Sequence, residues 1–335
     1  MVTRPMTKRV LTQRVVQYLF AALALAVAAV PAAAQTKWNL PAAYAANNYH
    51  SENLVWFAEE VKKATGGQLE ITVHPGASLF KAPEIKRAVA TGQAQMGEIL
   101  ISIHENEDPI FGLDTIPFTA TSFKDAYRLW QAQKPAMAKK LDSQGIMLLY
   151  SVAWGPQGLY VNKEVNSIDD MKGLKMRAYN VGTSRIAELV GAQAVTVQAA
   201  ELPQALATGT VNAFITSGST GYDSKAWETV GYFYDCQAWI PKNVIMVGKA
   251  AFNSLPKDQQ EAVLKAAAAA ETRGWQLAED KASWYLDQLK AKGMKVLPPS
   301  DGLNAGLKKL GDQLVADWEK RASAEGKEAL AAYRK

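Results

Sequence analysis

The chain has 335 residues, of which 48% are hydrophobic and 21% are charged, and its formal net charge is +5. Four of the positive charges lie before residue 15, so the rest of the chain is nearly neutral. Its charges are mixed in sign, which argues against a nucleic-acid-binding surface, because such a surface needs clustered Lys and Arg. About 300 residues of ordinary hydrophobic content suffice for two α/β domains, each with its own core.

Residues 1–34 predict a secretory signal peptide. Basic residues (Arg4, Lys8, Arg9 and Arg14) precede an apolar run at 15–30, and three alanines at 32–34 supply small residues for cleavage. We therefore expect cleavage near Gln35 and a periplasmic protein. An uncleaved membrane anchor is the alternative, but the run is shorter than the ~20 residues that comfortably span a bilayer.

The next segments alternate between short strands and amphipathic helices. Strands are predicted at 37–40, 69–74 and 94–99, and helices at 53–65 and 83–91. Glycines follow both helices, where a left-handed backbone is easiest to form. This alternation favours a mostly parallel sheet with helices on its faces.

A second series repeats this pattern. Its predicted strands cover 147–154, 159–162, 174–179, 194–197, 213–215 and 244–249, and its predicted helices cover 167–170, 183–190 and 200–207. A long helix is predicted from Lys257 to Lys290, which at ~1.5 Å per residue could cross both domains as a brace. A coiled-coil helix is the alternative, but no sustained heptad repeat is visible.

Signals for catalysis and for cofactors are weak. The three histidines, His50, His74 and His104, are far apart, and the usual nucleophile, phosphate-loop and metal-ligand motifs are missing from the sequence. We expect no metal and no cofactor. Cys236 is the only cysteine and has aromatic neighbours, so we expect it in the core rather than as a reactive thiol or in a disulfide with another chain. Ser217 is the one easy candidate for the nucleophile of a secreted hydrolase.

Arg177 is the strongest candidate for ligand binding. It alternates out of an apolar strand near the carboxyl end, where α/β sheets place their ligands. A guanidinium presents a planar fork that matches the two oxygens of a carboxylate, which a lysine cannot imitate. From the residues alone, a surface arginine remains the alternative.

Several segments in order resemble the solute-binding subunits of tripartite ATP-independent periplasmic (TRAP) transporters. The segment at 172–180 reads KGLKMRAYN, and that at 191–213 reads GAQAVTVQAAELPQALATGTVNA. Earlier matches are GGQLEITVHPGASL, ATGQAQMGE and DTIPF, so the similarity covers nearly the whole mature chain.

The resemblance implies a periplasmic-binding-protein-like α/β fold, with two α/β domains around a hinged cleft and a long C-terminal bracing helix. We expect domain I at 35–154, with 243–282 returning to it, and domain II at 155–242, with 283–335 packing on it. The implied function is capture of a small organic monocarboxylate, such as a hydroxy, sugar or aromatic acid, and its delivery to a sodium-driven permease. We expect a monomer that is not an enzyme. A sensor module of the same fold is the alternative.

The expected ligand-binding residues follow from the resemblance and from their places beside the predicted cleft. They are Arg177, Trp154, Asn180, Ser217, Thr216, Glu98, Tyr49, Asn48 and Trp239. In this family the strand arginine binds the carboxylate, which implies that role for Arg177. The hydroxyls of Thr216 and Ser217 stand where relatives carry an amide or an acid, which suggests a ligand with fewer hydroxyl groups.

The remaining predictions concern the walls of the cleft. Trp154 offers an indole for stacking on the ligand, with a core position as the alternative. Asn48 and Tyr49 lie in the predicted loop after the first strand, where a helix cap is the alternative. An acid beside a bound carboxylate would repel it, so we expect Glu98 to accept a hydrogen bond from a ligand hydroxyl. Trp239 would close one wall.

Overall fold

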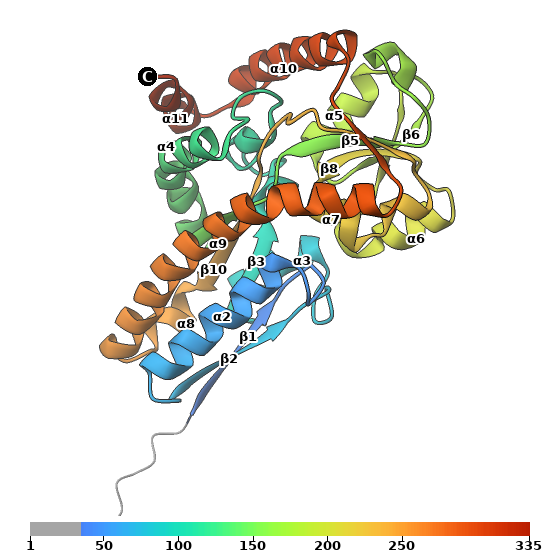
Figure 1. The fold of residues 1–335 in the computed structure, drawn as a ribbon. Coiled ribbons are helices and arrows are strands. Elements are labelled where there is room, and N and C mark those ends of the chain that lie inside the picture. The colour runs from blue at the N-terminus through green and yellow to red at the C-terminus, as the bar shows by residue number, and fades with distance from the viewer. Residues whose placement is uncertain (1–34) are drawn as a thin grey trace, which may run out of the picture. The chain divides into compact units, whose positions relative to one another are not determined.

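The computed structural model describes residues 35–335, so the predicted signal peptide lies outside the described residues. The strands of the described part form three sheets (Figure 1). The smallest pairs β1 (Thr36–Pro41) with β2 (Leu69–His74). A three-stranded sheet has the order β3 (Met96–Leu100), β10 (Lys242–Gly248), β4 (Ile146–Ala153).

The three-stranded sheet is antiparallel, and the expectation of a mostly parallel first sheet is wrong. Strand β10 pairs antiparallel with β3 on one side and with β4 on the other. Because β10 enters from residue 242, far along the chain, it separates β3 from β4. The local alternation of strands and helices therefore carried no information about strand direction here.

The third sheet has six strands and mixed directions. Its order is β11 (Lys295–Leu297), β9 (Tyr232–Tyr234), β5 (Gln157–Val161), β8 (Ala213–Ser217), β6 (Lys175–Ala178), β7 (Gln193–Thr196). Strand β6 is parallel to both β7 and β8, whereas β5 is antiparallel to β8 and β9. The parallel part carries Arg177 on β6.

Helices pack around these sheets. The shorter ones are α3 (Ala82–Ala90), α5 (Val181–Leu189), α6 (Leu202–Ala207), α7 (Gly218–Asp223), α8 (Lys249–Asn253) and α11 (Ala324–Arg334). The longer ones are α2 (Tyr49–Ala64), α4 (Phe123–Asp142), α9 (Lys257–Ala291) and α10 (Asp301–Arg321). Helix α2 begins earlier than the predicted 53, because the Asn48 side chain accepts a hydrogen bond from the His50 backbone N–H and caps it.

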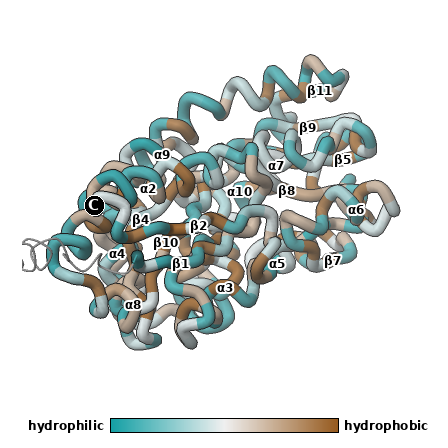
Figure 2. Tube along the Cα trace, turned by 90° about the horizontal axis from the view of Figure 1, so that it is seen from below, coloured by the Kyte–Doolittle hydropathy of each residue, from teal (hydrophilic) through white to brown (hydrophobic). Residues whose placement is uncertain are grey.

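Helix α9 covers the region predicted as one helix and runs past both larger sheets (Figure 1). It contacts α2 and β4, and also α7 and β11. Hydropathy alternates along it, as expected for a helix with one buried face (Figure 2). The predicted brace is therefore present.

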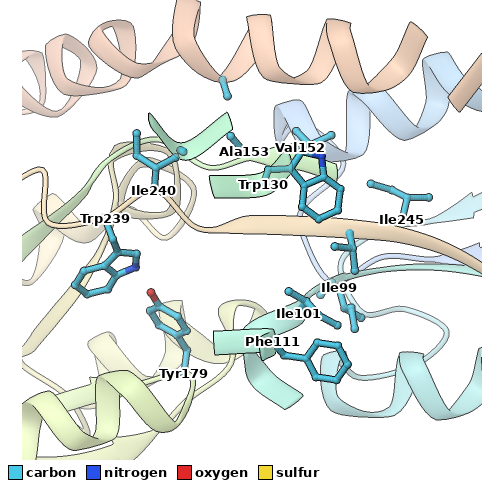
Figure 3. Close-up of a cluster of buried hydrophobic side chains, with 14 of the residues drawn as sticks. Ile99, Ile101, Phe111, Trp130, Val152, Ala153, Tyr179, Trp239, Ile240 and Ile245 are labelled. Carbon is cyan, nitrogen blue, oxygen red and sulfur yellow. The ribbon is translucent and has the colours of Figure 1, made fainter. Parts of the chain in front are cut away.

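The core runs continuously beneath the three-stranded sheet and toward the six-stranded one. Ile99 of β3, Val152 of β4 and Ile245 of β10 are buried together, and the aromatic residues Trp130 and Trp239 flank this cluster (Figure 3). Cys236 is also buried, as predicted, and burial raises the pKa of its thiol to about 12. Among the described residues, none of the helices is long and apolar enough to span a membrane.

The C-terminal helices contact both parts of the fold. Helix α10 contacts α5, which follows β6 of the six-stranded sheet, and also the 3-10 helix at Pro109–Thr115, whereas α11 packs on α4. Helix α4 and residues 109–115 lie within the segment 35–154. The packing of 283–335 on the second domain stays a prediction.

Candidate ligand-binding site

A small cavity of ≈ 30 Å³ lies where the ends of the two larger sheets meet. Its walls come from two parts of the fold. The part around the three-stranded sheet contributes Tyr44, Leu100, Trp154 and Pro241, and the part around the six-stranded sheet contributes Gln157, Arg177, Tyr179, Gln198, Ala199, Thr216 and Thr220. Three of the nine predicted site residues, Arg177, Trp154 and Thr216, therefore line one cavity. Residues from distant parts of the chain meet here, as expected of a cleft between two α/β units.

Arg177 is a buried cation, with 3% of its surface exposed. Its Nε donates to the Val197 carbonyl at 2.8 Å, and its guanidinium carbon lies 4.9 Å from the centre of the Tyr179 ring. Among the described residues, no Asp or Glu forms an ion pair with it. Burial lowers the pKa of Arg177 to about 10, with only the phenols of Tyr179 and Tyr44 acting in the opposite direction. The group stays charged at neutral pH without an anionic side chain beside it.

Aromatic rings form the wall that faces Arg177. The rings of Tyr44 and Trp154 meet edge to face, with centroids 4.6 Å apart. The Trp154 indole N–H donates to Oδ1 of Asn243 at 2.7 Å. Both alternatives considered for Trp154 therefore hold in part, because its ring lines the cavity while only 4% of its surface is exposed.

A wider cavity of ≈ 210 Å³ shares three lining residues with this one: Tyr44, Ala199 and Thr220. Gly76 and Ala45 line it from one side, and Pro203 and Asp223 from the other. The two cavities thus share one wall, and only the smaller one is lined by Arg177.

Glu98 pairs with a histidine instead of lining the cavity. Its Oε1 lies 3.3 Å from Nδ1 of His50, and both side chains are almost fully buried. The His50 ring packs against Trp154 in a tilted arrangement, with centroids 4.0 Å apart and an interplanar angle of 33°. Burial lowers the pKa of His50, although the hydrogen bond and charge of Glu98 act to raise it. This pair supports the aromatic wall from behind.

Three of the predicted polar ligands cap helices. Asn48 caps α2 and its Nδ2 donates to Oδ2 of Asp223 at 2.7 Å, which joins α2 to α7. Asn180 caps α5 and its Nδ2 donates to Ser102 Oγ at 3.0 Å, again between the two regions. Ser217 caps α7, and its hydroxyl lies 2.9 Å from that of Ser219. None of the three lines the Arg177 cavity.

Tyr49 and Trp239 lie in the surrounding core. The Tyr49 hydroxyl donates to the Ala153 carbonyl at 2.7 Å. The Tyr179 hydroxyl points toward the Trp239 indole, which is 1% exposed (Figure 3). Trp239 thus supports Tyr179, on which the Arg177 guanidinium rests, rather than closing the cavity directly.

Sequence reasoning left several lining residues out of the predicted site. Gln157 lies on β5, where its Nε2 donates to the Gly155 carbonyl and its Oε1 accepts from Tyr179. Asn243 orients Trp154 from β10. A polar residue in an otherwise apolar strand was the available signal for both, since such a residue needs a partner when buried. Among the described residues, no cluster of side chains could hold a metal ion.

Comparison with known proteins identifies the family. Residues 42–321 match the model for bacterial extracellular solute-binding proteins, family 7. The chain belongs to this family. It is therefore a solute-binding receptor of the TRAP type and not an enzyme, and it has the predicted periplasmic-binding-protein-like fold.

Three solved structures of receptors are similar over nearly their whole lengths. Two are extracytoplasmic solute receptors of Bordetella pertussis that bind pyroglutamic acid. The first is 53% identical, with 89% of this chain and 99% of that chain covered and a TM-score of 0.88. The second is 46% identical, with 90% and 100% covered and a TM-score of 0.89.

The third receptor comes from an unidentified microbe of a marine metagenome. It is specific for pyroglutamate and is 45% identical, with 90% of this chain and 99% of that chain covered and a TM-score of 0.88.

Proposed function

We propose that this receptor captures pyroglutamate, or a small cyclic acid of closely similar shape, and delivers it to a sodium-driven TRAP permease. The observation that carries the proposal is the buried guanidinium of Arg177 without an anionic partner in the protein. Transfer of a charged group from water into a protein interior is costly unless it is paired. A ligand carboxylate would supply the missing counter-charge.

The geometry around Arg177 favours a carboxylate over other anions. Nε is held by the Val197 carbonyl and the guanidinium plane rests on Tyr179, so the orientation of the fork is fixed. A fixed fork binds a carboxylate with two parallel hydrogen bonds, which are stronger than neutral ones. We assign Arg177 the role of carboxylate partner, with Thr216 and Trp154 beside it.

The lining of the site favours a compact ring. Leu100, Pro241, Trp154 and two tyrosines line the inner cavity beside neutral polar residues (Gln157, Gln198, Thr216 and Thr220), and acidic side chains do not line it. Such a lining suits a flat ring with few hydroxyls better than a linear sugar acid. Three receptors that are 45–53% identical bind pyroglutamate, which supports the same ligand class here.

Delivery to a permease follows from the family together with a hinge. We propose domain I at 35–154 and 243–282 and domain II at 155–242 with α10, and these close around the ligand in the periplasm after signal-peptide cleavage near Gln35. Several hydrogen bonds join the two domains, among them Asn48 to Asp223 and Asn180 to Ser102. We propose that the receptor acts as a monomer.

The test is a thermal-shift screen of organic acids, followed by calorimetry of those that stabilise the protein. A ligand at about 100 times its Kd adds about 2.7 kcal/mol to the free energy of unfolding, so a true ligand stands out. We expect pyroglutamate to give the largest shift. Pyroglutamamide is the matched control, because it keeps the ring and replaces the carboxylate with a neutral amide.

Equal stabilisation by pyroglutamate and by its amide would contradict the assigned role of Arg177. Stabilisation by a sugar acid or a linear dicarboxylate, with no response to pyroglutamate, would contradict the proposed ligand class while leaving the receptor function intact.

A further inference from the structure

The side chain of Asn243 has a fixed orientation and an unused donor. An indole N–H can only donate, so the bond from Trp154 Nε1 at 2.7 Å identifies the facing Asn243 atom as the oxygen. Its Nδ2 then points the other way. Asn243 is fully buried, and this Nδ2 has no hydrogen-bond partner among the described residues. A buried amide donor of this kind needs an acceptor.

Asn243 stands on the cavity side of the three-stranded sheet. On β10 it pairs with Leu100 of β3, and residues that face each other in a ladder carry their side chains on the same face. Leu100 lines the Arg177 cavity, and so does Trp154, which Asn243 holds. The unused donor therefore lies behind the wall opposite Arg177.

The phenol of Tyr44 connects this donor to the cavity. Tyr44 lines both the inner and the wider cavity; its phenol interacts with the charge of Arg177 and lies within hydrogen-bonding reach of the Asn243 side chain. Burial, followed by the charge of Glu98, raises the pKa of Tyr44 far above its usual value, so the hydroxyl keeps its proton. Tyr44 thus offers an O–H donor beside the Asn243 N–H donor.

We propose that Tyr44 and Asn243 form a subsite for a neutral carbonyl oxygen of the ligand, on the wall that faces Arg177. This subsite deepens the proposed function and rests on it: Arg177 binds the carboxylate, and the donor pair selects acids that carry a ring carbonyl at the other end. Asn243 acts mainly as a positioning residue, which aligns the Tyr44 hydroxyl through its unused N–H. Tyr44 contacts the ligand.

The subsite explains how such a site discriminates among cyclic acids of equal size. A site built to hydrogen-bond a polar group rejects an analogue that lacks it, because its buried donors then stay unpaired. An acid whose ring is hydrocarbon alone keeps the Arg177 contact but leaves the Tyr44 hydroxyl that Asn243 aligns without an acceptor. Selection therefore depends on the carbonyl and not on ring size.

Three ligands separate the carbonyl from the rest of the molecule. Pyroglutamate carries the ring carbonyl and the ring N–H, 3-oxocyclopentanecarboxylate keeps the carbonyl alone, and cyclopentanecarboxylate has neither. In calorimetry of the parent protein we expect the first two to bind, and cyclopentanecarboxylate to bind about 30-fold more weakly than the keto acid.

Two variants then test the donors. Tyr44→Phe keeps the ring and removes the hydroxyl, and Asn243→Leu keeps the approximate shape and removes the amide. In both we expect the preference for the keto acid to fall to about threefold or less, with cyclopentanecarboxylate bound at least as tightly as by the parent, because an unpaired donor no longer opposes the apolar ring. That second measurement is an internal control for the fold and for Arg177. Should Asn243→Leu fail to fold, Tyr44→Phe, at a half-buried position, decides the test.

The outcomes distinguish this inference from the proposed function. If the parent binds pyroglutamate and both folded variants keep the full preference for the keto acid, the subsite is wrong and the proposed function stands. If the parent binds none of the three cyclic acids, the proposed ligand class fails, and the subsite fails with it.

Discussion

Two buried cations, Arg177 and Lys242, differ in what balances their charge. Lys242 at the start of β10 is fully buried, and its Nζ lies 2.9 Å from Oδ2 of Asp114, which is itself 2% exposed. The same carboxylate oxygen accepts the Lys242 backbone N–H at 3.0 Å. Arg177 is buried to a similar degree, and no carboxylate of the described residues pairs with it. One charge has its counter-charge within the protein, and for the other we propose a counter-charge on the ligand.

The difference separates a structural charge from a binding charge. Burial lowers the pKa of Lys242, and the nearby Asp114 acts to raise it, so the carboxylate offsets part of the cost of burying the ammonium group. Removing one member of such a pair leaves an uncompensated buried charge. At Arg177 the free receptor already carries an uncompensated buried charge, and a bound carboxylate would lower the free-energy cost of that charge.

The largest expected effect comes from breaking the structural pair. Asp114→Asn keeps the shape of the side chain but leaves Lys242 without a counter-charge, so we expect the free energy of unfolding to fall by about 3–5 kcal/mol. Denaturant unfolding followed by circular dichroism measures it. Asp142→Asn is the matched control, because its pair with Lys249 is exposed and such pairs contribute about 1 kcal/mol or less. A loss at Asp114 no greater than at Asp142 would contradict the structural role.

Substitution of Arg177 should give the opposite pattern. We expect Arg177→Ala to raise the Kd for pyroglutamate about 100-fold or more, in line with the roughly 2–5 kcal/mol cost of truncating one member of a buried charged pair. Arg177→Lys should recover part of the loss, because an ammonium keeps the charge but not the planar fork. Calorimetry on folded variants is the measurement.

Arg185→Ala is the control for this experiment, since Arg185 lies on the exposed face of α5 and pairs with Glu188. We expect it to bind as the parent does. If Arg177→Ala lost stability but kept its affinity, Arg177 would have the same structural role as Lys242. The proposed difference between the two cations would then be wrong.

Sequence patterns located most elements of both larger sheets but not how the strands meet. The helix at α9 and the strand with Arg177 were visible because each carries its own periodicity. The insertion of β10 between β3 and β4 was not, because it depends on a contact between residues far apart in the chain. The direction of the first sheet was predicted wrongly for that reason.

The same distinction applies to the candidate site. Arg177, Trp154 and Thr216 line one cavity, as their places at strand ends suggested. Asn48 and Ser217 cap helices instead, because the short polar residues that contact ligands are also the ones that satisfy free N–H groups at helix starts. Composition alone does not separate these roles.

A third buried titratable group, His50, adds a prediction about how the free energy of unfolding depends on pH. Its pKa is lowered by burial, so the unfolded chain takes up a proton below about pH 6.5 that the folded protein resists. Stability from this group is therefore present above that pH and is lost as the pH falls, by up to about 1.4 kcal/mol per pH unit. His50→Gln should flatten the pH dependence of the unfolding free energy below about pH 6.5. An unchanged slope would mean that His50 titrates alike in the folded and unfolded protein, and a steeper slope in the variant would mean that Glu98 holds His50 in the charged form.

The smallest effect concerns the neutral wall opposite Arg177. Trp154→Phe keeps an aromatic ring in the cavity but removes the N–H that orients Asn243. We expect the binding free energy for pyroglutamate to weaken by about 1 kcal/mol, because one neutral hydrogen bond contributes about that much. Trp284→Phe, at an exposed indole of α9, is the matched control and should leave the affinity unchanged. Calorimetry gives both values. If Trp154→Phe bound as tightly as the parent while Arg177→Ala did not, the charge alone would determine affinity, and the aromatic wall would only exclude water from the buried pair.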